Sequence, residues 1–214
     1  LDLNQYKKLS QKEILSKKKE LGLKENDFVV LMIAELNENK NQVQLIEAME
    51  VLKDTYSEIK AICVGEGDKL SELQSEVKNR GLEGKVNFLG FRNDINELIN
   101  ICNIGVLLSY REGLPRNLME LMACGKKVIA TNIRGCRDIV VDETVGEIVE
   151  VGDYEATAKA IENQYLYGDN QFIISKEIEK YDVKTINEGL RLIYKELEEG
   201  GYYHKEGYAY SANE

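Results

Sequence analysis

The sequence has few of the residues that build metal and redox sites, and it has no long apolar run. It contains one histidine, His204, and four cysteines at positions 63, 102, 124 and 136, which form no Cys-x-x-Cys pair. Because zinc sites and redox dithiols are built from closely spaced pairs, we expect no metal ion, and thiols that stay reduced as in a cytoplasmic protein. No segment approaches the roughly 20 consecutive apolar residues of a membrane helix, so we expect no membrane span.

Basic residues are also in the minority. The chain has 28 lysines and arginines against 38 aspartates and glutamates, which gives a formal net charge of -10 at pH 7. Because proteins that bind nucleic-acid backbones by charge are basic, we expect no nucleic-acid partner. Net charge does not exclude one anionic small molecule at a local positive site. The 214 residues, 43% apolar and 31% charged, suffice for one globular domain.

What the chain does contain is a regular alternation of strand and helix patterns. Helical patterns at 41–56, 68–81, 93–102 and 115–125 separate short apolar runs, which are typical of strands buried on both faces of a parallel sheet. The alternation predicts an α/β fold, a doubly wound, Rossmann-like parallel sheet that binds ligands at the edge where its strands end. The six predicted strands are 28–34, 59–65, 86–90, 104–109, 127–131 and 146–151.

Two segments lie outside the predicted sheet. Residues 8–21 are expected to form a helix before the first strand. A tail without periodicity, 200–214, follows a predicted domain of 1–199; we expect it to be flexible, and its His204 to have no catalytic role. The domain would end in a helix at about 183–199 whose apolar residues form a narrow seam: Ile186, Leu190, Ile193 and Leu197.

The only proline, Pro115, stands where the helical pattern of 115–125 begins. At the first helical position a proline costs no hydrogen bond, and Gly113 just before it lets the backbone approach a ligand closely. The first-turn amides of Arg116, Asn117 and Leu118 would then point out of the helix end unpaired. Such an end attracts anions, phosphate above all.

Two glutamates bracket this helix start. Glu112 is predicted in the preceding loop and Glu120 more than one turn inside the helix. At 100° per residue, Glu120 falls about 200° from Leu118, opposite the apolar stripe that Leu118 forms with Met122. One interpretation is a solvated glutamate, and the other is a carboxylate that accepts hydrogen bonds from a ligand diol. Spacing alone favours the first and leaves the second open.

Longer motifs around these glutamates resemble a known enzyme family. The segment "REGLPRNLMELMACGKKVIATNIRGCRDIV" is similar to the signature of glycosyltransferase family four, the retaining GT-B enzymes also called glycosyl transferases group 1, whose E-x7-E motif matches Glu112 and Glu120. The segments "VVLMIAELNENKNQ", "AICVGEGDKLSELQ" and "VNFLGFRNDINELI" resemble the preceding units in the same order, and "LDLNQYKK" resembles the segment after the interdomain linker. The "GEG" at 65–67 alone would be weak evidence for a dinucleotide site, because it lacks the third glycine.

The resemblance implies a role for each matching residue. Glu120 would hold the ribose hydroxyls of a nucleotide diphosphate sugar, Glu112 would lie beside the sugar, and Lys40 would neutralise the diphosphate leaving group. Front-face attack, as implied for retaining members, requires no protein nucleophile and no metal or other cofactor. Two segments would complete the donor site, the helix start at the sugar and diphosphate and a turn near the base: Gly113, Leu114, Pro115, Arg116, Asn117 and Leu118, and Gly90, Phe91 and Arg92.

One position departs from the family pattern. Many members carry an arginine five residues before the lysine, whereas this chain has Glu35 there. The departure leaves Lys40, with Arg111 or Arg116, as the phosphate cation. The "ELNENKNQ" form resembles bacterial capsule and exopolysaccharide glycosyltransferases, for which a UDP-sugar is the expected donor.

The resemblance covers about residues 1–165 and concerns only the C-terminal, donor-binding half of a GT-B enzyme. The chain begins with Leu1, so we expect a fragment or a processed form that lacks the N-terminal acceptor domain and transfers sugar poorly or not at all alone. The terminal helix would normally cross to that domain; without it, its seam would form a homodimer or pack back on the sheet. The full-length protein would work on a polysaccharide or lipid-linked acceptor, in the cytoplasm or at the inner face of the membrane.

Two other functions stay open at this point. A nucleotide-sugar 2-epimerase shares the GT-B fold and the donor, but it usually needs acidic and histidine residues in its cleft, and the single histidine here, in the tail, argues against it. A non-catalytic module that binds a nucleotide or a protein partner is the other alternative.

Overall fold

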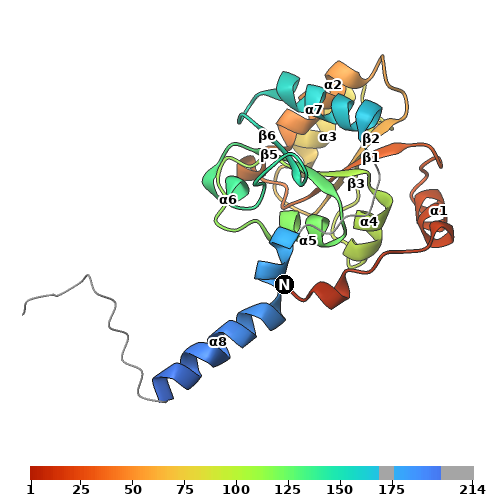
Figure 1. Ribbon diagram of the computed structural model, residues 1–214. Helices are drawn as coiled ribbons and strands as arrows, with labels where there is room; N and C mark the ends of the chain where they lie inside the picture. The colour runs from red at the N-terminus through yellow and green to blue at the C-terminus, as the bar shows by residue number, and fades with distance from the viewer. Residues whose placement is uncertain (169–175, 199–214) are drawn as a thin grey trace, which may run out of the picture.

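Six parallel strands form the centre of the molecule (Figure 1). In this computed structural model, which describes residues 1–168 and 176–198, they lie in the order β3-β2-β1-β4-β5-β6. This is the strand order of a Rossmann fold, so the prediction of a doubly wound parallel sheet is confirmed. The strands are β1 (Phe28–Ile33), β2 (Ile59–Val64), β3 (Val86–Phe88), β4 (Ile104–Leu107), β5 (Lys127–Thr131) and β6 (Gly146–Val149).

Each strand begins where its apolar run begins, but most end one or two residues earlier than predicted. β4 ends at Leu107, whereas the predicted run extended to Ser109. Leu108 and Ser109 are both buried, so they read as strand residues in the sequence. They belong instead to the loops in which the chain turns away from the sheet.

Helices cover both faces of the sheet because alternate strand residues point to opposite sides (Figure 1). On β1, Val30 and Met32 pack toward one helical layer, while Val29 and Leu31 pack toward the other. The first layer contains α2 (Gln42–Leu52), α3 (Leu70–Asn79) and α7 (Tyr154–Tyr167). The second contains α1 (Gln11–Glu20), α4 (Ile95–Ile101), α5 (Arg116–Ala123) and α6 (Arg134–Arg137).

Local signals explain where α1 starts and why the sequence pattern did not predict α7. α1 begins at Gln11, later than predicted, because Ser10 and Glu13 form a capping box in which each side chain binds the other's backbone amide. The sequence pattern did not reveal α7, because its buried face consists of small residues with one isoleucine: Thr157, Ala158, Ala160 and Ile161.

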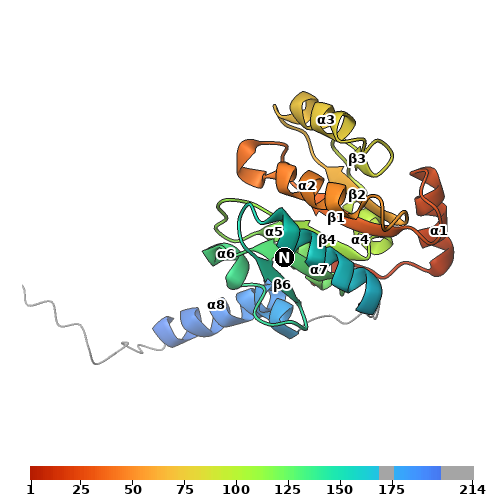
Figure 2. The ribbon, with the colours of Figure 1, turned by 90° about the horizontal axis from the view of Figure 1, so that it is seen from above.

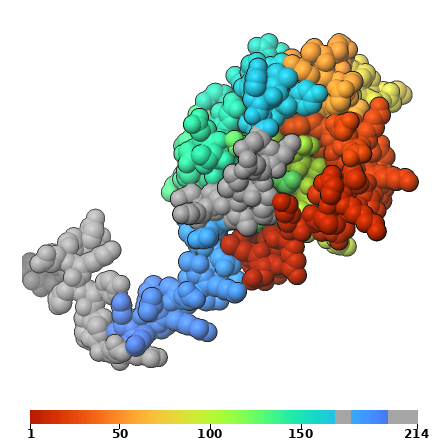
Figure 3. Space-filling view, turned by 45° about the vertical axis from the view of Figure 1, so that its right-hand side comes forward, coloured from red at the N-terminus to blue at the C-terminus, as the bar shows by residue number. Residues whose placement is uncertain are grey.

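The terminal helix α8 (Val183–Glu198) follows the 3-10 helix η3 (Lys176–Tyr181) and projects from the body of the molecule (Figures 1, 2 and 3). The four residues of the predicted seam are all exposed, by 45 to 58%. Residue 199 and the predicted tail, 200–214, lie outside the described residues. The domain limits therefore stay a prediction.

Residues 1–9, which we call the N-terminal strap, run from the base of α8 along α4. Leu1 donates its terminal amine to the Tyr181 carbonyl at 3.0 Å and accepts a hydrogen bond from the Val183 amide at 2.7 Å. The strap contains the 3-10 helix η1 (Leu3–Gln5). Figure 3 shows the strap in red beside the first turns of α8.

Two further observations concern sequence features. All four cysteines are buried and form no disulfide bond, and burial raises the pKa of the Cys63 thiol to about 12. Within the described ranges, no helix has both the length and the apolarity that crossing a bilayer requires.

Candidate functional site

The candidate site lies where the strand order reverses, between β1 and β4. In open α/β sheets, ligands bind outside the carboxyl ends of the strands at such a point. Here the loops after the two strands are joined by hydrogen bonds. The Tyr110 amide donates to the Asn39 carbonyl at 2.8 Å, and the Asn39 side-chain amide donates to the Arg111 carbonyl at 3.0 Å.

Lys40 and Glu112 form an ion pair across these loops. Lys40 Nζ lies 2.5 Å from Glu112 Oε1, and Ser109 Oγ donates to the same oxygen at 2.7 Å. The two charged side chains are 22% and 12% exposed. Lys40 ends the 3-10 helix η2 (Glu38–Lys40), whose start is capped by the Asn37 side chain. The structure thus holds a cation and a carboxylate together at the edge where ligands bind.

The start of α5 lies beside this pair. Pro115 has an extended conformation and precedes the helix, so the prediction that it is the first helical residue is wrong by one position. The Leu118 amide, which was predicted to be free, donates to the Asn117 side-chain oxygen at 2.9 Å. Among the described residues, the amides of Arg116 and Asn117 have no partner. The helix end therefore offers two amides, and not the predicted three, to an anion.

Two contacts fix the positions of this helix start and of the loop before it. The Asn117 side-chain amide donates to the carbonyl of Ile33, the last residue of β1, at 2.7 Å. Beneath the loop, α6 begins so close that a Cβ on Gly135 would lie 2.6 Å from the carbonyl oxygens of both Glu112 and Gly113. Only glycine permits this approach. On the outer side of the loop Gly113 meets open space, and Leu114 is exposed.

Glu120 does not lie in open solvent, although helical spacing placed it opposite the apolar stripe. Its side chain is 14% exposed, and its Oε1 accepts hydrogen bonds from Tyr6 Oη and Arg116 Nε, both at 2.9 Å. Burial, together with the Glu120 carboxylate, raises the pKa of Tyr6 to about 12. The N-terminal strap therefore contributes a residue to the candidate site.

The turn after β3 lies at the same edge of the sheet, at the carboxyl ends of the strands. Gly90 has a left-handed conformation, and its carbonyl accepts a hydrogen bond from the Gly65 amide at 2.9 Å. Phe91 is 68% exposed. The Arg92 guanidinium binds the Asp94 carboxylate at 2.5 and 2.7 Å, so it already has an anionic partner.

The "GEG" segment has a structural explanation. A Cβ on Gly65 would lie 2.1 Å from the Ala34 carbonyl oxygen, and one on Gly67 would lie 2.1 Å from that of Leu36. These glycines let the loop after β2 pack directly on the loop after β1. The packing supports the segment that carries Lys40.

Two arginines, Arg116 and Arg111, were predicted as further phosphate cations, and both side chains are exposed. Arg116 is paired with Glu120 and its side chain is 72% exposed. Arg111 is exposed, and so is Glu35, whose backbone carbonyl accepts a hydrogen bond from the Gln42 side chain. In the part of the chain that the structure describes, no group of three or more His, Cys, Asp or Glu residues could hold a metal ion.

Two residues of the candidate site were not predicted from the sequence. Ser109 could have been noticed as the one polar residue that closes the apolar run 104–109. Tyr6 carried no local signal, because its partner Glu120 is 114 residues away in the chain.

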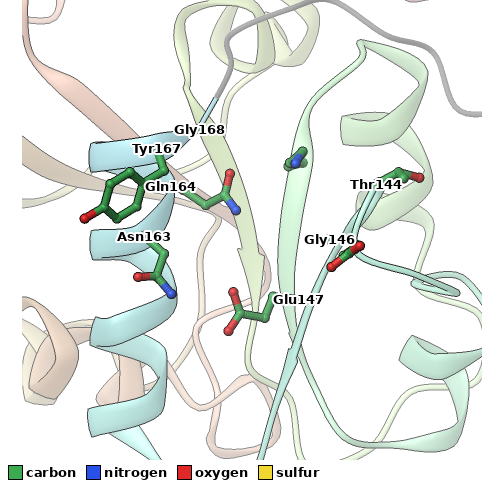
Figure 4. A pocket seen from close by; sticks show the side chains of 9 residues that line it. Thr144, Gly146, Glu147, Asn163, Gln164, Tyr167 and Gly168 are labelled. Atoms are coloured by element: carbon green, nitrogen blue, oxygen red, sulfur yellow. The ribbon is translucent and has the colours of Figure 1, made fainter.

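A separate hollow lies at the opposite edge of the sheet (Figure 4). Glu147 on β6 and Gln164 on α7 face it, and Lys127 contributes from the first position of β5. Because these strand residues stand at the amino ends of their strands, the hollow is not part of the candidate site.

Comparison with known proteins decides the family. The sequence matches the family described as Glycosyl transferases group 1 over residues 13–191. The chain belongs to this family. The resemblance seen in the sequence motifs is therefore confirmed for most of the domain.

Two curated proteins and one solved protein illustrate what the chain is similar to. EpsD of Bacillus subtilis, a predicted glycosyltransferase, is 41% identical over 144 residues, which are 67% of this chain and 38% of EpsD. The UDP-Gal:alpha-D-GlcNAc-diphosphoundecaprenol alpha-1,3-galactosyltransferase of Escherichia coli is 30% identical to this chain. The match covers 68% of this chain and 38% of the length of the E. coli protein. HepE of Anabaena, solved with UDP and with UDP-glucose, matches with a TM-score of 0.82 in the UDP complex, at 29% identity over 91% of this chain and 55% of HepE.

The chain matches only part of the length of each of these relatives. The chain spans about two fifths of the length of the curated relatives and just over half of HepE. The six-stranded sheet corresponds to one half-domain of a GT-B fold.

Proposed function

We propose that this chain is the donor-binding domain of a retaining glycosyltransferase, and that it binds a nucleotide diphosphate sugar at the carboxyl ends of β1 and β4. The observation that carries the proposal is the Lys40–Glu112 ion pair beside the start of α5. The pair brings a cation and a carboxylate together beside two unpaired helix amides, and this combination supports binding of a diphosphate and its sugar there.

Lys40 is the residue on which diphosphate binding depends. The negative charge of the leaving diphosphate grows in the transition state, and a fixed cation stabilises it there more than in water. Glu35 adds no positive charge at the position where many relatives carry arginine. Arg116 is exposed and Arg111 lies in the loop next to Glu112, so either side chain can reach toward the phosphates as a secondary cation.

Glu112 serves as a contact to the donor sugar and not as a nucleophile. Its Oε1 accepts hydrogen bonds from Lys40 and Ser109, and the Ser109 bond keeps the carboxylate oriented when Lys40 turns to the diphosphate. With Glu120 at the ribose and the Gly90–Arg92 turn at the base, exposed Phe91 offers a ring on which a base could stack. The site requires no metal ion or other cofactor in this mechanism.

The donor is a UDP-sugar in this proposal. HepE, which is similar over 91% of the chain, was solved with UDP and with UDP-glucose, and the name of the E. coli relative specifies UDP-Gal. The acceptor is a polysaccharide or a lipid-linked sugar, as the diphosphoundecaprenol in the name of that relative supports.

The acceptor would bind to a second, N-terminal domain. Because the chain spans 38% of EpsD and 55% of HepE, we propose that it transfers sugar weakly or not at all when it is alone. The exposed seam of α8 would bind that domain, in a protein that works in the cytoplasm or at the inner face of the membrane.

Isothermal calorimetry with UDP-, GDP- and ADP-sugars tests the proposal. We expect the chain to bind a UDP-sugar, and Lys40→Ala and Glu120→Ala each to weaken binding by about tenfold or more, because each removes a charged hydrogen-bond partner. Lys159→Ala is the matched control, since it breaks a Lys–Glu pair of the same length on the outer face of α7. No binding to any nucleotide would contradict the proposal and favour a partner-binding module.

A further inference from the structure

A tyrosine from the N-terminal strap holds the carboxylate that we place at the ribose. Tyr6 Oη donates to Glu120 Oε1 at 2.9 Å. Arg116 Nε donates to the same oxygen, also at 2.9 Å. Because a carboxylate oxygen has two lone pairs, these two donors fill Oε1.

The second carboxylate oxygen is in a different state. Within the described ranges, Glu120 Oε2 accepts no hydrogen bond, and its two acceptor positions remain open. The carboxylate is therefore turned so that one oxygen serves the protein and the other can serve a ligand.

The two donors on Oε1 do not hold it equally firmly. The Arg116 side chain is 72% exposed, so water competes for its hydrogen bond. Tyr6 is half-buried against the layer of α4 and α5. The high pKa of its phenol, about 12, means that Tyr6 carries its proton at physiological pH and remains a donor.

The backbone around Tyr6 is anchored at several points. The Lys7 amide binds Asn96 Oδ1 at 3.1 Å, and the Leu9 amide binds Asn100 Oδ1 at 2.9 Å. The Asn100 side-chain amide also donates to the Lys7 carbonyl at 2.9 Å. These bonds to α4 set the position of the phenol before any ligand arrives, so little ordering is needed on binding.

We propose that Tyr6 is a positioning residue for ribose recognition: it fixes Glu120 so that Oε2 alone receives the two hydroxyls of the ribose diol. The inference rests on the proposed function, because it requires a nucleotide at this site. It adds a residue outside the E-x7-E motif, and it makes discrimination between ribose and deoxyribose depend on the strap.

The test compares two ligands on three proteins by calorimetry. The ligands are UDP and 2′,3′-dideoxy-UDP, which differ only in the ribose hydroxyls. The proteins are the wild type, Tyr6→Phe and the matched control Tyr56→Phe. Tyr56 donates to Glu162 Oε1 at 2.6 Å on the opposite helical layer, so its variant loses a bond of the same kind away from the site.

We expect the wild type and Tyr56→Phe to prefer UDP over the dideoxy ligand by about 100-fold, as two hydrogen bonds to a charged group imply. Tyr6→Phe should reduce this preference about tenfold while its affinity for the dideoxy ligand stays unchanged. A general loss of folding would lower both affinities together, and thermal unfolding of each variant measures it directly.

The outcomes separate the two proposals. If the wild type binds neither ligand, the proposed function is wrong and the role of Tyr6 falls with it. If the wild type prefers UDP and Tyr6→Phe keeps the full preference, the donor site stands and the positioning role of Tyr6 is overturned.

Discussion

Lys40 Nζ and Glu112 Oε1 lie 2.5 Å apart, although the two residues are 72 positions apart in the chain. The pair neutralises the lysine that we place at the donor diphosphate. A phosphate must therefore compete with Glu112 for Lys40. Once Lys40 turns to the phosphate, Glu112 can accept hydrogen bonds from a sugar.

This competition predicts opposite effects on two ligands in Glu112→Gln. UDP should bind about fivefold more tightly than to the wild type, because Lys40 no longer has to leave a carboxylate. The gain in affinity from UDP to UDP-glucose should shrink, since an amide accepts hydroxyl hydrogen bonds less strongly. Calorimetry with both ligands measures this. Weaker UDP binding by Glu112→Gln would contradict the competition.

Gly135→Ala should disturb the site from beneath. The new methyl group would overlap the carbonyl oxygens of Glu112 and Gly113, so the loop must move. We expect the free energy of unfolding to fall by about 1–3 kcal/mol and UDP affinity to fall with it. Chemical denaturation and calorimetry measure the two effects.

Gly113→Ala is the control for this substitution. A Cβ at Gly113 meets no atom within 4 Å, so the free energy of unfolding should stay unchanged. Its methyl group would lie on the open side of the loop and lower UDP-glucose binding only. Equal destabilisation by both alanines would show that packing beneath the loop is not the cause.

The ion pairs at the start of α4 predict a pH dependence of stability. Arg92, with help from Lys17, holds the pKa of Asp94 well below its ordinary value of about 3.9. A carboxyl group whose pKa is lowered by folding stabilises the protein above that ordinary value, and the stabilisation is lost as pH falls through the folded-state pKa.

Asp94→Asn should therefore be less stable than the wild type by about 1–2 kcal/mol at pH 7. The difference should shrink steadily below about pH 4, as the wild-type carboxyl group takes up its proton. Urea denaturation across this range measures it, with Asp54→Asn, an exposed aspartate after α2, as the control. A difference that does not depend on pH would mean that packing, and not charge, explains the loss.

The seam on α8 predicts self-association of the isolated chain. Its apolar side chains gain by leaving water, and a second copy offers the same seam. Sedimentation equilibrium should show a concentration-dependent dimer that Leu190→Glu with Ile193→Glu abolishes. Arg191→Glu, between the seam positions, should leave the dimer intact. A wild-type chain that stays monomeric would leave α8 to the proposed second domain.

Much of the fold could be predicted because it depends on local composition. The continuous apolarity of residues 28–33 marks a strand buried on both faces, and the Gly81 position correctly marks the end of α3 with a left-handed backbone. α7 could not be predicted in the same way, because alanine and threonine fill a closely packed face without an apolar stripe.

The candidate site was accessible through motifs more than through spacing. Helical geometry favoured a solvated Glu120, and only the resemblance placed it at a ligand. The contact with Tyr6 depends on how the strap crosses α4, which no local pattern encodes. Likewise the Leu118 amide was predicted to be free, but the neighbouring Asn117 side chain satisfies it.

The attachment of α8 has a consequence for the candidate site. The helix is attached at its start, where the Val183 amide donates to the Leu1 carbonyl and Asp182 Oδ1 accepts from the Leu3 amide. Its remaining length projects away from the body (Figure 1). The start of α8 is held by one end of the same nine residues that carry Tyr6. The base of α8 and the Glu120 carboxylate are therefore connected through the first six residues of the chain.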